Sequence, residues 1–125
     1  MFEQDYIMRI IKEMVKFILK LLFDIDTESA TSELLEDEEE KATLESLLDM
    51  VDKGAICDAK NIILEMIDIN DRKRLEVVLL FYSYLNDKTD VFFEENNFSR
   101  KELQEDLKYI LSQYGLGSIA ETVLL

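Results

Sequence analysis

The side chains in this sequence that could do chemistry are carboxylates and a single thiol. Asp and Glu together number 28, whereas the 125-residue chain has no histidine and one cysteine, Cys57. Catalysis near neutral pH most often uses histidine, because the histidine pKa lies in that range. The sequence also lacks a serine-nucleophile motif, a glycine-rich phosphate loop and a dinucleotide-binding motif. We therefore predict a protein that is not an enzyme, with no catalytic residues and no cofactor.

One group of acids has the spacing of a metal-binding loop. Asp24, Asp26 and Glu28 alternate as the first ligands of a calcium loop do. Such a loop needs glycine at its sixth position and glutamate at its twelfth, and these positions hold Ser29 and Leu35. Metal sites in helical bundles commonly add histidine ligands, which this chain lacks. The sequence therefore predicts no metal site.

Charge and cysteine content narrow the class of partner and the compartment. The net charge is −14, so the surface should repel nucleic-acid phosphates, and we expect no nucleic-acid partner. The lone Cys57 cannot form an internal disulfide, which favours a reducing compartment. Asp58 beside it opposes formation of a reactive thiolate. We expect a cytoplasmic protein in which Cys57 is structural.

The strongest hydrophobic pattern predicts an N-terminal helix over residues 1–24. Its polar residues fall on a stripe about 120° wide, which leaves an apolar face roughly twice as wide as a surface helix needs. Basic residues interrupt the pattern too often for a secretory signal or a membrane-spanning helix: Arg9, Lys12, Lys16 and Lys20. The sequence therefore predicts a helix that is covered from two sides.

Three kinds of cover are open. The later helices of the chain could wrap the N-terminal helix. A second copy could pack on it, since a set of apolar residues alternates by four and three as in a helix–helix seam: Ile7, Ile11, Met14, Ile18 and Leu21. A membrane surface is the alternative, favoured by the basic stripe but opposed by the acidic remainder of the chain. We predict a homodimer through this seam.

The rest of the chain predicts one all-α domain, residues 1–125, with an acidic linker over 25–33 and helical hairpins over 34–125. The chain has no proline and only three glycines, too few turn residues for a β-rich protein of this size. We expect helices over about 32–52, capped by Thr31 or Ser32, then over 56–67, 71–85 and 99–114. Residues 87–98 should form a partly helical connector whose aromatic side chains dock on the core. A last short turn is expected over 119–125.

Two resemblances follow from these segments. The spacing of Gly54, Ile56, Ala59 and Ile63 resembles the second half of a tetratricopeptide repeat. That resemblance implies antiparallel helical hairpins, with the long N-terminal amphipathic helix packed against them. The repeat's aromatic is replaced by Ile56, and no second clear copy follows at the expected period.

The start QDYIMRII, the segment KGAICDAKNIILEMID and the later NNFSRKEL together resemble a family of short bacterial proteins of unknown function. This resemblance implies a helical cytoplasmic protein and supplies no catalytic residues. We therefore predict a non-enzymatic helical interaction or scaffold module with an unknown protein partner. The alternative is a membrane-peripheral protein held by its basic N-terminal helix.

Overall fold

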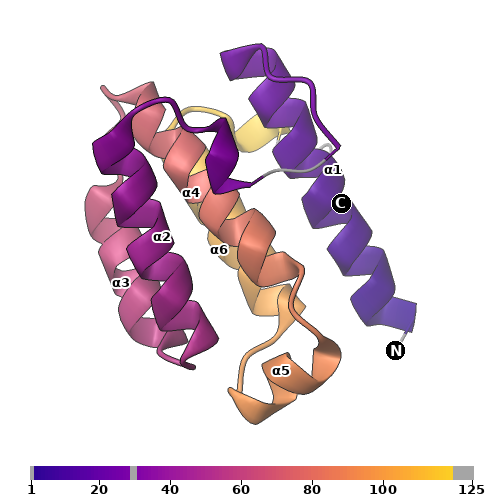
Figure 1. The fold of residues 1–125 in the computed structure, drawn as a ribbon. Coiled ribbons are helices and arrows are strands. Elements are labelled where there is room, and N and C mark those ends of the chain that lie inside the picture. The colour runs from indigo at the N-terminus through magenta and orange to yellow at the C-terminus, as the bar shows by residue number, and fades with distance from the viewer. Residues whose placement is uncertain (1, 29–30, 120–125) are drawn as a thin grey trace.

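In the computed structural model, residues 2–28 and 31–119 are described, and every regular element among them is a helix. The α-helices are α1 (Phe2–Phe23), α2 (Glu38–Asp52), α3 (Ile56–Met66), α4 (Arg72–Asn86), α5 (Asp90–Glu95) and α6 (Arg100–Gln113), and a 3-10 turn, η1, spans Ser32–Leu34. Figure 1 shows α4 and α6 between α1 on one side and the α2–α3 pair on the other. The predicted all-α class is confirmed.

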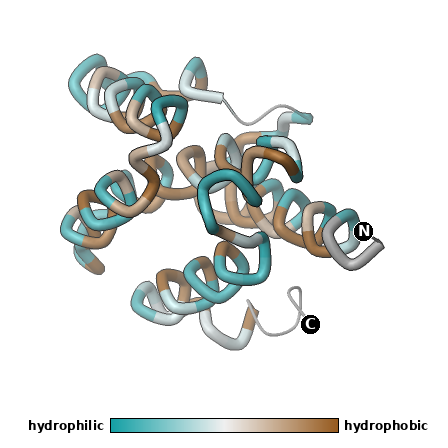
Figure 2. The backbone as a smooth tube through the Cα atoms, turned by 90° about the horizontal axis from the view of Figure 1, so that it is seen from below, coloured by the Kyte–Doolittle hydropathy of each residue, from teal (hydrophilic) through white to brown (hydrophobic). Residues whose placement is uncertain are grey.

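Helix α4 lies at the centre of the core. It packs against α1, α2 and α6, and nine of its fifteen residues are buried. The buried run includes Val77 to Tyr82 without a break, so both faces of the helix are covered. Figure 2 shows hydrophobic stretches alternating with hydrophilic ones along the helices of the bundle. A helix that is apolar all round is stable only when it is enclosed in this way.

Helix α1 covers one side of α4 and α6 with its inner face. Its fully buried residues lie at helical spacing and include Ile11, Met14 and Ile18. The helix ends at Asp24, where the backbone adopts a positive φ of 54°. A left-handed residue of this kind commonly terminates a helix, and aspartate tolerates it better than most.

The segment between α1 and α2 differs from the prediction. The helix expected from about Ser32 starts only at Glu38, and neither Thr31 nor Ser32 is its cap. Asp37 caps it instead, because its carboxylate accepts the backbone N–H of Glu40 at 3.0 Å. Before that cap, Leu35 is extended and buries its side chain in the core, which interrupts the helix.

Helices α2 and α3 pack together as a hairpin joined by a very short turn. Gly54 occupies the turn with φ +85°, and a Cβ there would lie 2.8 Å from the side-chain oxygen of Asn96. The backbone angle favours glycine, and a Cβ would in addition displace the Asn96 side chain. Ile56, Ala59 and Ile63, which carry the resemblance to a tetratricopeptide repeat, are buried.

The remaining helices match the prediction closely. Asp71 caps α4, and the hydroxyl of Ser99 caps α6 by accepting the N–H of Glu102 at 3.1 Å. The connector contains the short helix α5, and the aromatic side chains Phe92, Phe93 and Phe98 pack on the core as expected. The last predicted turn, over 119–125, lies outside the described residues apart from Ile119.

A buried arginine joins α4, α5 and α6. Arg100 is only 2% exposed, and its guanidinium donates to the carbonyl of Asn86, with a nitrogen-to-oxygen distance of 3.2 Å from Nη2. It also donates to the carbonyl of Lys88 and forms an ion pair with Asp90. The cation therefore satisfies the carbonyl of the last residue of α4, Asn86, and that of Lys88 just beyond the helix. Asn86 extends the network to α1 by donating from Nδ2 to the carbonyl of Met8 at 3.0 Å.

The two sides of α1 should respond differently to truncation. Ile18→Ala should lower the free energy of unfolding by about 2–5 kcal/mol, because Ile18 is fully buried. Leu21→Ala, on the outer side of the same helix, should cost less than about 1 kcal/mol. Urea unfolding followed by circular dichroism measures both, and equal losses would contradict the packing of α1 described here.

Removing the buried cation should be costly. Arg100→Met should destabilise the chain by about 1–3 kcal/mol, because the carbonyls of Asn86 and Lys88 lose their buried donor, while the half-exposed Asp90 is solvated by water. Arg9→Met, at an exposed position, is the matched control and should change stability by less than about 0.5 kcal/mol. Thermal unfolding of both variants at one pH compares them directly.

Candidate functional site

The residues predicted to face a second copy lie mostly inside the chain. Ile7, Ile11, Met14 and Ile18 are buried, and the inner face of α1 packs against α4 and α6. Leu21 alone among the five is on the surface, at 52% exposed. The predicted seam, whose residues are spaced alternately by four and three positions, is therefore covered mostly by the chain's own helices. A homodimer through α1 needs a different face of that helix.

The outer side of α1 carries such a face. Tyr6 is 55% exposed and Phe17 is 45% exposed, and with Leu21 and the half-buried Ile10 they form one stripe, which we call the α1 stripe. An open hollow of about 440 Å³ lies along it, lined by Tyr6, Arg9, Ile10 and Glu13. The sequence predicts the wide apolar face of α1 to which this stripe belongs. It does not show which part of that face is exposed, because exposure depends on how the other helices pack.

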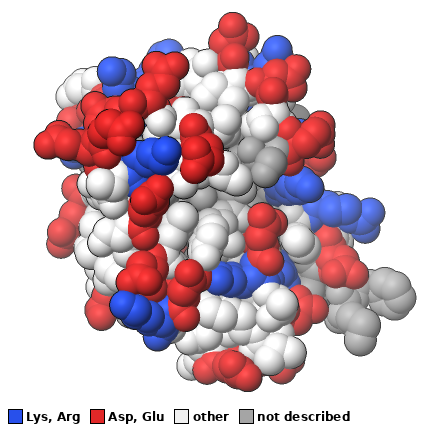
Figure 3. Space-filling model, viewed as in Figure 1, with Lys and Arg blue, Asp and Glu red and all other residues white. Residues whose placement is uncertain are grey.

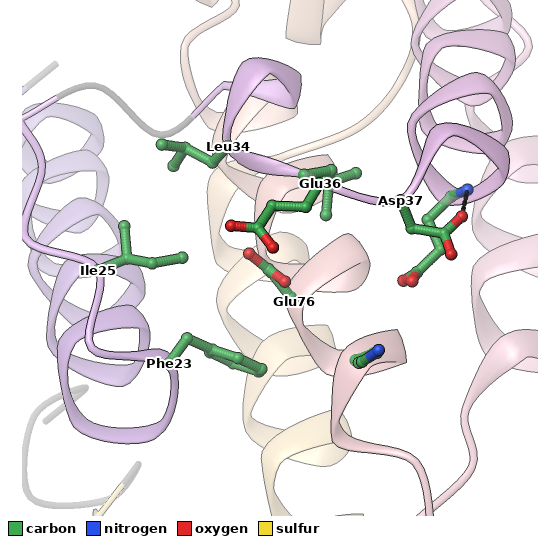
Figure 4. A pocket seen from close by; sticks show the side chains of 9 residues that line it. Phe23, Ile25, Leu34, Glu36, Asp37 and Glu76 are labelled. Carbon is green, nitrogen blue, oxygen red and sulfur yellow. Dashed lines mark hydrogen bonds between the residues drawn. The ribbon is translucent and has the colours of Figure 1, made fainter.

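A second feature is an acidic pocket of about 260 Å³ between the α1–α2 linker and α4. Its apolar wall includes Phe23, Ile25 and Leu34, and Figure 4 shows the carboxylates of Glu36 and Glu76 pointing toward each other in front of it. The dashed line in that figure is the capping bond that Asp37 accepts.

The electrostatics of this pocket disfavour charged carboxylates. Burial, followed by the charges of Glu40 and Glu36, raises the pKa of Glu76. Burial, followed by Asp37 and Asp71, raises the pKa of Glu40. Within residues 2–28 and 31–119, no group of three or more acidic or cysteine side chains has a geometry that could hold a metal ion. The pocket therefore contains crowded acids without a metal-binding arrangement.

The thiol of Cys57 and the basic side chain of Arg74 do not join either of these features. Cys57 is exposed in the first turn of α3, and in the described part of the chain it is not grouped with other possible metal ligands. Arg74 forms an ion pair with Asp71 at 3.6 Å and donates to the carbonyl of Met66 at 3.1 Å. Among the described residues, no helix is long and apolar enough to cross a membrane.

The buried polar pair Arg100 and Asn86 was missed by sequence reasoning. In the sequence pattern Arg100 falls only within the predicted helix over 99–114, and Asn86 lies just beyond the predicted helix over 71–85. One signal was available: Asp90 and Phe93 lie ten and seven positions before Arg100, where a charged and an aromatic partner can meet it after a short turn. In the structure the guanidinium carbon of Arg100 lies 4.5 Å from the centre of the Phe93 ring. The pair joins α1, α4, α5 and α6 and so stabilises the fold.

The crowded acids predict a stability that rises on mild acidification. Because the pKa of Glu76 is raised in the folded chain, the fold binds its proton more tightly than the unfolded chain does, and stability increases as pH falls from 7 toward the ordinary value of 4.5. Glu76→Gln should therefore stabilise the protein at pH 7 by up to about 1 kcal/mol. That gain should shrink at pH 4.5, as measured by thermal unfolding at each pH.

Two comparisons belong to this experiment. Glu94→Gln, on the exposed side of α5, removes the same charge elsewhere and should leave stability unchanged at both pH values. Asp52 acts in the opposite sense, because its bond to Lys88 lowers its pKa, so the stability that it supplies is lost as pH falls below its ordinary value of 3.8. An equal gain from Glu76→Gln at pH 7 and pH 4.5 would contradict the assignment.

Comparison with known proteins assigns the chain to a family but does not assign it a reaction. No curated protein and no solved structure matches it. A family model described as a family of unknown function, DUF6483, matches residues 1–115, which is nearly the whole chain. The resemblance to a family of short proteins of unknown function is thereby confirmed. The chain belongs to the DUF6483 family.

Proposed function

We propose that this protein is a non-enzymatic helical interaction or scaffold module that forms a homodimer through the α1 stripe. The observation that carries the proposal is the symmetry of the stripe. Tyr6, Ile10, Phe17 and Leu21 are separated by four, seven and four positions, so the spacing reads the same in both directions. Two such helices packed antiparallel around a two-fold axis would set Tyr6 opposite Leu21 and Ile10 opposite Phe17.

The charge distribution supports a protein partner over a lipid surface. Helix α1 carries four basic and three acidic residues, so the whole acidic excess of the chain lies outside this helix. An anionic membrane would attract α1 weakly and repel the rest. In addition, the buried inner face of α1 is engaged with α4 and α6, which leaves only the narrow α1 stripe for lipid. The exposed thiol of Cys57 fits a reducing compartment such as the cytoplasm.

The stripe is small, and this bears on the strength of the dimer. Four side chains of one helix bury less than the roughly 800 Å² per partner of a standard interface. We therefore expect a dissociation constant on the order of 10–100 µM. An association of this strength is suited to a module that assembles when it is concentrated.

The dimer can be tested by sedimentation or light scattering over a series of concentrations. The wild-type chain should pass from monomer to dimer between about 1 and 300 µM. Phe17→Glu should keep the chain monomeric and folded, because Phe17 is already 45% exposed. Tyr109→Glu, a matched control at an exposed aromatic of α6, should dimerise as the wild type does.

A chain that stays monomeric at 300 µM would overturn the dimer. Vesicle sedimentation distinguishes the alternative. Binding to anionic vesicles at low salt that is lost on replacing Lys20 and Arg9 by Glu would favour the membrane-peripheral function instead.

A further inference from the structure

A second surface, separate from the α1 stripe, lies on the α2–α3 hairpin on the opposite side of the bundle. One hollow of about 510 Å³ and another of about 370 Å³ both include Thr43 and Ile62 in their linings, so the two hollows adjoin on one face of the hairpin. We call the two together the hairpin groove. Small side chains on α2, Ala42 and Ser46, leave the space that the groove occupies.

The floor of the hairpin groove is apolar. Ile62 is 38% exposed, and Met50 and Met66 are half-buried at its two ends. Along α2 the lining runs from Glu39 to Met50, which is about 16 Å of helix or three turns. This length and this floor match the apolar face of one short amphipathic helix.

One end of the hairpin groove is strongly acidic. Five carboxylates line it against one base, Arg74: Asp37, Glu39, Glu40, Glu65 and Asp71. Arg74 is itself engaged by Asp71 and by the carbonyl of Met66. Among the described residues Glu39, Glu40 and Glu65 form no ion pair. Figure 3 shows acidic side chains crowded on the surface where α2 begins.

The electrostatics of Glu40 agree with an excess of negative charge at this end of the groove. One carboxylate oxygen of Glu40 is buried without a hydrogen-bond partner, and burial together with Asp37 and Asp71 raises the pKa of Glu40. A cation placed at this end would relieve that repulsion. A neutral or acidic ligand would add to the cost of burying the carboxylates.

We propose that the hairpin groove binds a cationic amphipathic helix of a protein partner other than this chain. Apolar side chains of that helix, at spacing i, i+3 or i+4 and i+7, would lie on Ile62, Met50 and Met66. Lysine or arginine side chains beside them would meet Glu39, Glu40 and Glu65. The proposal does not depend on the homodimer, which uses α1.

A designed peptide tests the groove in the full-length protein. The probe is a fluorescein-labelled 15-residue helix with Leu at the i, i+3, i+4, i+7 positions and Lys at the others. A matched probe replaces each Lys by Glu. Fluorescence anisotropy should show the Lys probe binding at least about tenfold more tightly than the Glu probe, with an affinity that falls as salt is added.

Variants locate the binding site. The double variant Glu39→Gln and Glu65→Gln should weaken binding of the Lys probe about tenfold. Glu94→Gln with Glu95→Gln, on α5, removes the same total charge and should leave the affinity unchanged. Ile62→Gln should also weaken binding, whereas Val91→Gln, at another exposed apolar position, should not.

Three results would overturn the proposal. Equal loss in both double variants would mean attraction to net charge alone. Loss of probe binding in Phe17→Glu, with the groove variants unaffected, would place the probe on the α1 stripe. If Glu39→Gln with Glu65→Gln instead abolished self-association in light scattering, the groove would be occupied by a second copy. Circular dichroism of each variant confirms that it is folded.

Discussion

The complete burial of α4 is the constraint on which the other helices depend. An apolar run from Val77 to Tyr82 has no polar side to turn to water, so α1, α2 and α6 must all pack against it. The polar groups at the end of this helix are then removed from solvent as well. Arg100 supplies the donors that the terminal carbonyls require, and Asn86 ties the same region to α1. The burial of the apolar side chains of α4 therefore goes together with the hydrogen bonds that satisfy its C-terminal end.

Helix α1 and the α2–α3 hairpin, which form the outer layers of the bundle, each have a face that does not pack against α4. In α1 the unused face is the α1 stripe, and in the α2–α3 hairpin it is the hairpin groove. The two differ in charge, because α1 carries four basic and three acidic residues whereas one end of the groove has five acids and one base. One molecule of 125 residues can thus present two chemically different surfaces at its two sides. This property suits a protein that connects other molecules.

Local patterns in the sequence predicted most helices because each helix has a local cause. Asp71 and Ser99 cap their helices through neighbouring backbone groups, and Gly54 marks a turn whose positive φ favours glycine. The start of α2 could not be predicted in this way. There the burial of Leu35 against distant parts of the chain outweighs the helical preference of the acidic segment, so Asp37 becomes the cap.

By itself the sequence determined the all-α class, the limits of α3, α4 and α6, and the wide apolar surface of α1, since these follow from periodicity and capping within one segment. Only the tertiary structure decided which part of that surface is available. Packing against α4 and α6 buries Ile7, Ile11, Met14 and Ile18 and leaves Tyr6, Phe17 and Leu21 exposed. The hairpin groove also required the fold, because its walls come from α2, α3 and the start of α4, whose relative positions depend on long-range contacts.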